Sequence, residues 1–433
     1  MSLAADDHRY IWHPFTQQQG WVEEDPVIIE AADGTTLIDT DGRRYIDGVS
    51  SLWCNVHGHR HPRIDAAIKD QLGKVAHSTM LGLSHRPAIE LARRLVALAP
   101  AGLSRVFYSD SGSTATEIAL KMAFQFWAQN REPNSRAKFI SLKDAYHGDT
   151  LGSVSAGGID LFHETYRPLL FDTLKAEPGD IADMHRLLAD NEGEVAAVMM
   201  EPLVQGAAGM LMHPPGYLAA VRHLCDRYGV LLICDEVATA FGRTGTMFAC
   251  EQEAVAPDLM CFAKGISGGY LPLAATLTSE RIYEGFLGRY DEYRTFFHGH
   301  TYTGNPLACA AAIATLDVFD EERTLESLQA KIGLLERLLE PIAQLDCVRE
   351  VRQRGFMVGI ELDGSDPALR AAHRVALEAR AGGAIIRPLG DVVVLMPPLS
   401  IERDELQRLV SITRQAIEAA TSQPQSSSLR VAA

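Results

Sequence analysis

Two apolar runs of this sequence end directly on residues that can do chemistry. Val230–Cys234 is followed by Asp235, and Leu259–Ala263 is followed by Lys264. Short apolar runs rich in branched side chains are typical of strands covered on both faces, and open parallel sheets bind ligands at the carboxyl ends of their strands. A carboxylate and an amine there suit an aldehyde cofactor held as a lysine Schiff base, with an aspartate that keeps its ring nitrogen protonated. The two residues could equally be a helix-capping acid and a surface lysine.

Three more apolar runs are followed by residues that suit the same chemistry. The loop Ser109–Thr114 is rich in Ser and opens a helix, so its free N–H groups could hold a phosphate, although Ser and Thr also cap helices routinely. Tyr146 could stack on a flat ring or simply pack, and Glu201 could polarise a ring substituent or be a solvated loop acid. Each signal is weak alone, but together they would bring phosphate donors, an aromatic ring, two acids and an amine to one sheet edge.

The elements that must position these residues are short strands that alternate with helical stretches. Apolar spacing predicts helices over Pro62–Leu72, Pro87–Leu98 and Ala115–Trp127. The predicted strands are Arg105–Tyr108, Lys138–Leu142, Val195–Met200, Val230–Cys234, Leu259–Ala263 and Leu273–Leu277. Such alternation predicts an α/β fold with a mainly parallel sheet and helices on both faces.

The two ends of the chain indicate a second, smaller unit. Residues 1–60 carry turn signals and short strands, which predict a small meander leading into Ser50–Trp53. A long helical region follows Pro306, and residues 346–420 alternate strands and helices again. We therefore expect four segments: 1–60 as the N-terminal part of a small α+β domain, 61–317 as a large cofactor-binding domain, 318–421 as the C-terminal part of the small domain, and 422–433 as a disordered tail.

Composition limits the function classes. With 433 residues, of which 47% are hydrophobic and 22% charged, the chain is long enough for more than one domain. The net charge of -16 argues against nucleic acid or an acidic membrane as a partner. The cysteines lack zinc-ligand spacing, and no apolar run approaches the roughly 18 residues of a membrane span. Because residues 1–10 are acidic and polar rather than signal-like, we expect a cytoplasmic protein without a metal site.

Longer motifs give the sequence a family resemblance. They are Trp12–Gln17, Asp47–His61, Ser109–Met122, Tyr146–Thr150, Asp235–Glu251, Lys264–Leu271 and His298–Ala312. With these motifs, which are spread over essentially the whole chain, the sequence resembles the class III aminotransferases. The resemblance implies the aspartate-aminotransferase-like fold, which is fold type I of the pyridoxal phosphate (PLP) enzymes, and an aminotransferase that uses pyridoxal 5'-phosphate as its cofactor.

The resemblance implies roles for residues around the cofactor ring. Lys264 would form the Schiff base, and Asp235 would pair with the pyridinium nitrogen. Val237 would pack on one face of the ring and Tyr146 would flank the other, while Glu201 would lie near Asp235 or the substrate entrance. In the implied transamination, the substrate amine displaces Lys264, which then moves a proton from the substrate Cα as general base and acid.

The resemblance also implies how the phosphate is bound. Gly112 and Ser113 would bind it through their backbone N–H groups. Thr301 would reach the phosphate of the neighbouring subunit's cofactor, so that the active unit would be a homodimer with shared active sites.

For the substrates, the resemblance implies a pocket that receives an amino donor and a keto acceptor in turn. Arg387 would receive a substrate carboxylate, Trp53 would line the pocket, and Arg243 would lie beside it. Phe15 and Leu52 stand where some members carry Tyr and Trp. This pattern resembles the subgroup that accepts lysine, so we place lysine slightly ahead of S-adenosylmethionine as the amino donor.

The implied acceptor is 8-amino-7-oxononanoate, the precursor of 7,8-diaminononanoate in biotin biosynthesis. A broad-specificity ω-amine:pyruvate transaminase is the alternative within the same class, because it would share nearly every cofactor residue. An aminomutase or a decarboxylase on the same fold is a further alternative, and a non-catalytic binding protein is another.

Overall fold

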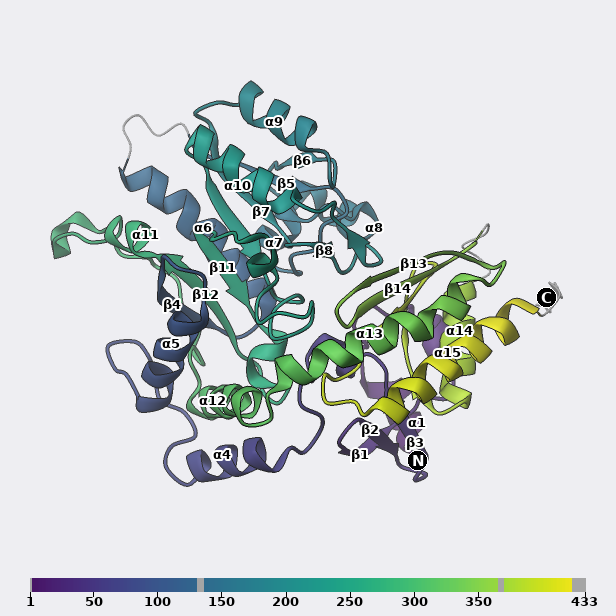
Figure 1. The fold of residues 1–433 in the computed structure, drawn as a ribbon. Coiled ribbons are helices and arrows are strands. Elements are labelled where there is room, and N and C mark those ends of the chain that lie inside the picture. Colours follow the sequence, from purple (N-terminus) through teal and green to yellow (C-terminus); the bar gives the residue numbers. More distant parts are fainter. Residues whose placement is uncertain (1, 131–135, 365–369, 423–433) are drawn as a thin grey trace.

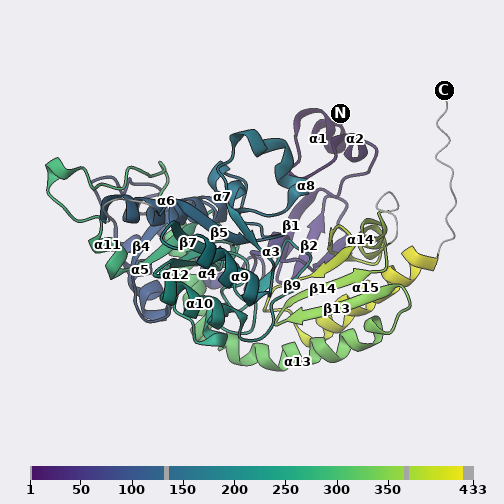
Figure 2. The same cartoon turned by 90° about the horizontal axis from the view of Figure 1, so that it is seen from above.

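The alternation of strands and helices in the sequence produces two packed units. The computed structural model of the chain describes residues 2–130, 136–364 and 370–422. One unit is built on a seven-stranded sheet, and the other on two four-stranded sheets. Figures 1 and 2 show that the purple N-terminal strands and the yellow C-terminal helix lie in the same unit, beside the teal and green elements of the large sheet.

The large sheet carries the strand ends that the sequence marked as reactive. Its strands, in spatial order, are β4 (Leu103–Ser109), β12 (Ala274–Ser279), β11 (Leu259–Phe262), β10 (Leu231–Asp235), β7 (Val195–Met200), β5 (Lys138–Leu142) and β6 (Leu174–Ala176). All neighbouring pairs are parallel except those that β12 makes with β11 and β4. The prediction of a mainly parallel sheet is therefore confirmed.

Helices cover both faces of this sheet, as the strand composition requires. The helices of the large unit are α4 (Pro62–Leu72), α5 (Arg86–Leu98), α6 (Gly112–Asn130), α7 (Leu151–Ala156), α8 (Asp160–His163), α9 (Ile181–Asp190), α10 (Tyr217–Tyr228), α11 (Glu280–Glu284) and α12 (Pro306–Glu321). In β10, Leu231 and Ile233 pack with residues of α6, whereas Leu232 and Cys234 pack in a cluster that includes α10. Successive side chains thus point to opposite covered faces, which explains the unbroken apolar run.

The second unit joins the two ends of the chain. One of its sheets has the order β1 (Ile29–Asp33), β2 (Thr36–Asp39), β3 (Arg44–Asp47), β15 (Ala384–Ile385). Its other sheet has the order β13 (Val348–Arg354), β14 (Met357–Leu362), β17 (Val392–Leu395), β16 (Arg387–Leu389). The helices of this unit are α1 (Leu3–Tyr10), α2 (Gln18–Trp21), α13 (Thr324–Ala343), α14 (Ala371–Ala381) and α15 (Arg403–Ser422). Because β3 pairs with β15, the predicted N-terminal meander completes a sheet with a strand from the C-terminal part.

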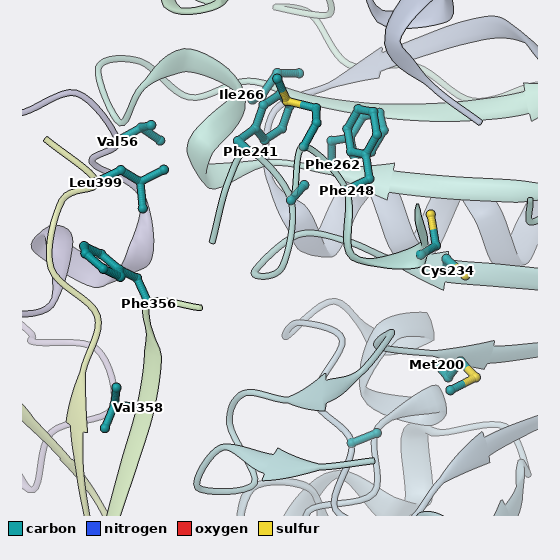
Figure 3. Close-up of a cluster of buried hydrophobic side chains, with 14 of the residues drawn as sticks. Val56, Met200, Cys234, Phe241, Phe248, Phe262, Ile266, Phe356, Val358 and Leu399 are labelled. Carbon is teal, nitrogen blue, oxygen red and sulfur yellow. The ribbon is translucent and has the colours of Figure 1, made fainter. Parts of the chain in front are cut away.

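An apolar cluster links the two units beside the site (Figure 3). From the large unit, the rings of Phe248 and Phe262 stack at 5.0 Å between centroids, and Phe241 packs edge-on against both. Phe356 and Leu399 of the second unit are buried in the same cluster. This cluster holds the segment after β10 and the end of β11 in fixed positions relative to the second unit.

Two further observations concern the described part of the chain. None of its helices combines the length and the apolar character needed to cross a membrane. Within the same residues, no group of three or more His, Cys, Asp or Glu side chains could hold a metal ion. Of the predicted tail, Ser422 ends α15, and 423–433 lie outside the described residues.

Candidate active site

Asp235 and Lys264 both line a pocket of about 740 Å³. Asp235 is the last residue of β10 and is 3% exposed. Lys264 opens the short turn Lys264–Ser267 that follows β11, the parallel neighbour of β10. Because the carboxyl ends of parallel strands meet at one edge, the two charged groups reach the same pocket from adjacent strands.

Both carboxylate oxygens of Asp235 are fixed. The backbone N–H of Val237 donates to Oδ1 at 3.0 Å, and Nδ1 of the buried His147 contacts Oδ2 at 2.7 Å. Since a carboxylate only accepts, Nδ1 of His147 must carry the proton and donate it. An oriented, buried carboxylate of this kind is suited to hold a protonated ring nitrogen.

The first residues of α6, Gly112 and Ser113, lie on the same pocket. We call these two residues the phosphate cradle, because the first N–H groups of a helix have no intrahelical acceptor and attract anions. A Cβ on Gly112 would lie 2.6 Å from Cγ1 of Val237, so only glycine lets the cradle approach the segment after Asp235.

Tyr146 forms one wall of the pocket and belongs to a small aromatic cluster. Its hydroxyl donates to Oδ2 of Asp149 at 2.7 Å, and its ring lies 6.3 Å from each of the rings of Phe15 and Phe162. Burial raises the pKa of the Tyr146 hydroxyl, and the bond to Asp149 acts in the same direction. The hydroxyl therefore stays protonated at neutral pH.

Burial shifts the pKa values of two charged residues of the pocket, Glu201 and Lys264. Burial raises the pKa of Glu201 to about 8, and the charge of Asp235 adds to the effect. Oε1 of Glu201 accepts the N–H of Gly206 at 3.1 Å, whereas Oε2 has no protein partner among the described residues. Burial lowers the pKa of Lys264, against the opposing effect of Asp235 and Glu201. A lysine with a lowered pKa is more often in the neutral form that attacks an aldehyde.

Trp53 reaches the pocket from a strained segment. Four consecutive residues, Ser50–Trp53, have positive φ values of 50°, 55°, 113° and 69°, a conformation that costs of order 1–3 kcal/mol for each non-glycine residue. Asp47 holds the segment by accepting from Ser51 N at 2.8 Å and Ser51 Oγ at 2.7 Å. The Trp53 ring lies 5.6 Å from Nζ of Lys264, measured to the ring centroid.

Arg243 braces the same segment from inside the protein. It is 2% exposed, and its guanidinium donates to Ser50 Oγ at 2.8 Å, Asn55 O at 2.6 Å and Pro397 O at 2.5 Å. It is not among the residues that line the pocket. The structure thus places Arg243 behind the Trp53 segment, where its Nη1 and Nη2 atoms donate to the protein.

The predicted site residues fall into two groups. Those that line the pocket are Trp53, Gly112, Ser113, Tyr146, Glu201, Asp235, Val237 and Lys264. Phe15, Leu52, Arg243, Thr301 and Arg387 are not among its lining residues. Phe15 and Leu52 are exposed at 59% and 47%, Thr301 is also exposed, and Arg387 is half-buried on β16. Burial lowers the pKa of Arg387, and Tyr146 acts in the opposite direction.

Sequence reasoning missed His147 and Phe162. His147 lies within the motif Tyr146–Thr150, but no spacing rule connects it with Asp235, which is 88 residues away along the chain. Phe162 lies in α8, where no apolar pattern pointed to the pocket.

Comparison with known proteins places this geometry in a family. The family model described as aminotransferase class-III matches residues 18–417. The chain is 58% identical to the adenosylmethionine-8-amino-7-oxononanoate aminotransferase of Nitratidesulfovibrio vulgaris, over 97% of this chain and 82% of the relative. It is 51% identical to the protein of the same name from Aquifex aeolicus, over 96% and 97% of the two chains.

Solved structures agree with the sequence relatives. The crystal structure of adenosylmethionine-8-amino-7-oxononanoate aminotransferase from Methanocaldococcus jannaschii matches with a TM-score of 0.95 and 45% identity, over 97% of this chain and 99% of that one. An amine transaminase from an uncultivated Pseudomonas species, solved with PLP bound, matches with a TM-score of 0.89 and 36% identity, over 95% and 99%.

Proposed function

The chain belongs to the class III aminotransferases, and from this we propose that it transfers an amino group to 8-amino-7-oxononanoate, forming 7,8-diaminononanoate in biotin biosynthesis. It is a PLP-dependent transaminase of fold type I. The single observation that carries the activity is that Lys264 lines the same pocket as the carboxyl groups of Asp235 and Glu201, both of which oppose the lowering of its pKa by burial. The names of the relatives carry the choice of substrates.

The residues of the pocket fit pyridoxal phosphate. The N-terminal N–H groups of α6 suit its phosphate, the buried Asp235 suits its ring nitrogen, and Lys264 suits its aldehyde. Val237 and Tyr146 would hold its two ring faces. When bound, the cofactor supplies an aldehyde for amines and a ring that accepts electrons from the substrate carbon.

We propose that side chains of the protein keep the ring nitrogen protonated, transfer the substrate proton and limit the access of water. Asp235, oriented by His147 and Val237, keeps a ring nitrogen protonated. The amine of Lys264 would act as the general base that takes the proton from the substrate Cα and as the general acid that gives it back. Trp53 and Tyr146 limit the access of water and set the plane in which the reacting atoms lie.

For the acceptor, we propose that Arg387 receives the terminal carboxylate. Burial has already removed part of the water around its guanidinium, and this strengthens a charge-assisted bond. The aromatic walls, Trp53 and Tyr146, suit a chain of methylene groups. Since Arg387 lies outside the pocket lining, the substrate would extend from Lys264 past Tyr146 towards β16.

For the amino donor, we propose lysine or S-adenosylmethionine. The relatives carry adenosylmethionine in their names. The residues Phe15 and Leu52 favour lysine, because they offer a bulky sulfonium neither a tyrosine hydroxyl nor an indole face. Both side chains are exposed, and the Phe15 ring lies 6.3 Å from that of the pocket residue Tyr146, measured between centroids.

We also propose a cytoplasmic homodimer with shared active sites. All the cysteines are free thiols, which fits a reducing compartment. Thr301 is exposed and has exposed Phe297 and Tyr302 as near neighbours in the chain. Large apolar side chains on one exposed segment are typical of a surface that another chain covers.

Single-turnover measurements test the substrate assignment. The PLP-loaded protein would be mixed with lysine or with S-adenosylmethionine, and the loss of the absorbance of the lysine-bound cofactor would be followed. The amine form would then receive 8-amino-7-oxononanoate, and we expect 7,8-diaminononanoate to form. If neither donor reacts while simple amines and pyruvate turn over well, the protein is instead an ω-amine:pyruvate transaminase.

A further inference from the structure

The N-terminal ends of α6 and α7 meet behind the phosphate cradle. Thr150 is the N-cap residue of α7, but its side chain makes no capping bond to the first turn of that helix. Instead, the carboxylate of Glu117, which lies on α6, accepts the N–H groups of Gly152 at 2.8 Å and Ser153 at 3.2 Å. A side chain of one helix therefore satisfies the free donors at the start of the other.

The same carboxylate is connected to the cradle through Thr150. The Thr150 hydroxyl donates to Oε2 of Glu117 at 2.7 Å, and this is the shortest of the hydrogen bonds that the hydroxyl can donate. Oγ of Ser113 donates to the Thr150 hydroxyl at 3.0 Å and accepts the Thr150 N–H at 2.8 Å. The Ser113 hydroxyl is thus occupied within the protein, and this arrangement leaves the backbone N–H groups of the cradle for a phosphate.

Two glycines make this contact possible. A Cβ on Gly152 would lie 2.5 Å from Oε2 of Glu117, so a larger residue would displace the carboxylate. Gly148 has a φ of +113°, and a Cβ there would lie 2.3 Å from Cβ of Ser113. The segment between the two glycines therefore lies directly against α6, and any shift of Glu117 is passed on to Thr150 and Ser113.

We infer that Glu117 is a positioning residue for the cofactor phosphate, acting through Thr150 and Ser113 without touching the phosphate itself. Glu117 does not line the pocket, whereas Thr150 and Ser113 do. This inference rests on the proposed cofactor chemistry and deepens it, because it names what fixes the cradle. It requires that Glu117 matter for ligands that carry a phosphate and not for ligands that lack one.

The test compares two ligands on the cofactor-free protein. Dissociation constants would be measured by titration with pyridoxal phosphate and with pyridoxal, which lacks the phosphate. We expect Glu117→Ala to weaken the binding of pyridoxal phosphate about tenfold or more, the effect of losing one acceptor shared by buried donors. The dissociation constant for pyridoxal should stay within about twofold of the wild-type value. Glu117→Gln keeps an acceptor oxygen and should restore most of the affinity.

A second variant and a control complete the test. Gly152→Ala keeps Glu117 but pushes its carboxylate away, so it should reproduce the phosphate-specific loss, and it decides the test alone if Glu117→Ala does not fold. The carboxylate of Glu253 likewise accepts backbone N–H groups at the start of a helix, α10, from Gly216 at 2.8 Å and from Ala219 at 2.9 Å. Glu253→Ala is therefore the matched control. Equal losses for both ligands, or no loss, would overturn the inference. Wild-type protein that binds both ligands equally would instead overturn the proposed phosphate site.

Discussion

At the scale of single residues, the orientation of Asp235 is the feature on which the proposed chemistry depends most. The carboxylate is held by His147 and by the Val237 N–H, and it is almost fully buried. We expect Asp235→Asn to lose most of its turnover and to bind pyridoxal phosphate more weakly, because a buried cation without its partner costs roughly 3–5 kcal/mol.

Steady-state turnover at saturating cofactor checks this expectation. Asp190→Asn removes an exposed carboxylate on α9 and serves as the control, since its ion pair with Arg186 is solvent-exposed at 3.5 Å. Turnover close to the wild-type value in Asp235→Asn would rule out the assigned role.

Glu201 gives a pH-dependent prediction. Burial raises its pKa from 4.5 to about 8 in the folded chain, so between these values the folded protein holds a proton that the unfolded chain releases. The free energy of unfolding must then fall as the pH rises through this window. We expect Glu201→Gln to reduce this fall in the cofactor-free protein, as urea unfolding from about pH 5 to about pH 9 would show. Identical pH profiles for the two proteins would contradict the assignment of a raised pKa.

The sequence predicted those site residues that follow the end of a strand. Asp235, Lys264, Tyr146 and Glu201 follow apolar runs, and the parallel sheet brings them to one pocket. The bond between His147 and Asp235 could not be predicted, because it depends on the spacing of β5 and β10 in the folded sheet. Nor does any sequence rule indicate that the Arg243 donors turn towards backbone carbonyls inside the protein.

At the scale of elements, Asp258, the residue directly before β11, gives a prediction about the free energy of unfolding. Asp258 accepts the N–H of Leu232 on β10 at 2.9 Å and Nη1 of Arg222 on α10 at 2.8 Å. Asp258→Ala leaves two partly buried donors unpaired and should lower the free energy of unfolding by about 2–4 kcal/mol.

The same arginine offers a matched control. Asp226 also pairs with Arg222, at 2.6 Å, but its side chain is 65% exposed. Asp226→Ala should therefore cost no more than about 1 kcal/mol. Urea unfolding of both variants measures the difference, and equal losses would mean that the strand contact of Asp258 contributes nothing.

The elements themselves were predicted best where they are long or fully buried. The predicted Lys138–Leu142 and Val195–Met200 coincide with β5 and β7. The short strand β6, Leu174–Ala176, was not predicted, because it has only one fully buried residue and carries Lys175. An apolar run gives no strand direction, so the antiparallel orientation of β12 appeared only in the structure. The short connection after β11 explains it, since a parallel return needs a long crossover.

At the scale of the whole molecule, the sequence pattern indicated two units but not how the chain's ends meet. The pairing of Ala384 with Ile46 joins segments too far apart in sequence for any local pattern to reveal. It also brings Trp53, soon after β3, and Arg387, soon after β15, to the same part of the second unit. The proposed substrate pocket therefore depends on both ends of the chain.

A shared site predicts complementation between defective chains. We expect Lys264→Ala and Thr301→Ala proteins to be nearly inactive alone and to regain activity when mixed dimers form. Each mixed dimer has one site with an intact lysine from one chain and an intact threonine from the other. The measurement is turnover after co-refolding or co-expression. A fully active monomer in light scattering would contradict the shared site.

The central claim is that Lys264 carries the cofactor in the assembled enzyme. Among the described residues, burial also lowers the pKa of Lys331, whose amine donates to Leu399 O at 3.0 Å, and it lowers the pKa of the half-buried Lys175 to about 8. That amine, however, donates to Ser141 Oγ at 2.8 Å and to Ala156 O at 2.9 Å. Lys121 and Lys143 lie near the cradle and the Tyr146 loop in sequence, but they contact His298 and Glu177.

Borohydride reduction of the PLP-loaded protein, followed by peptide mapping, tests the claim most directly. Reduction fixes the cofactor permanently on the lysine that holds it. We predict a label on Lys264 alone, and no label in Lys264→Ala protein that still binds the cofactor. A label on Lys121, Lys143 or Lys175 in the wild-type protein would contradict the assignment.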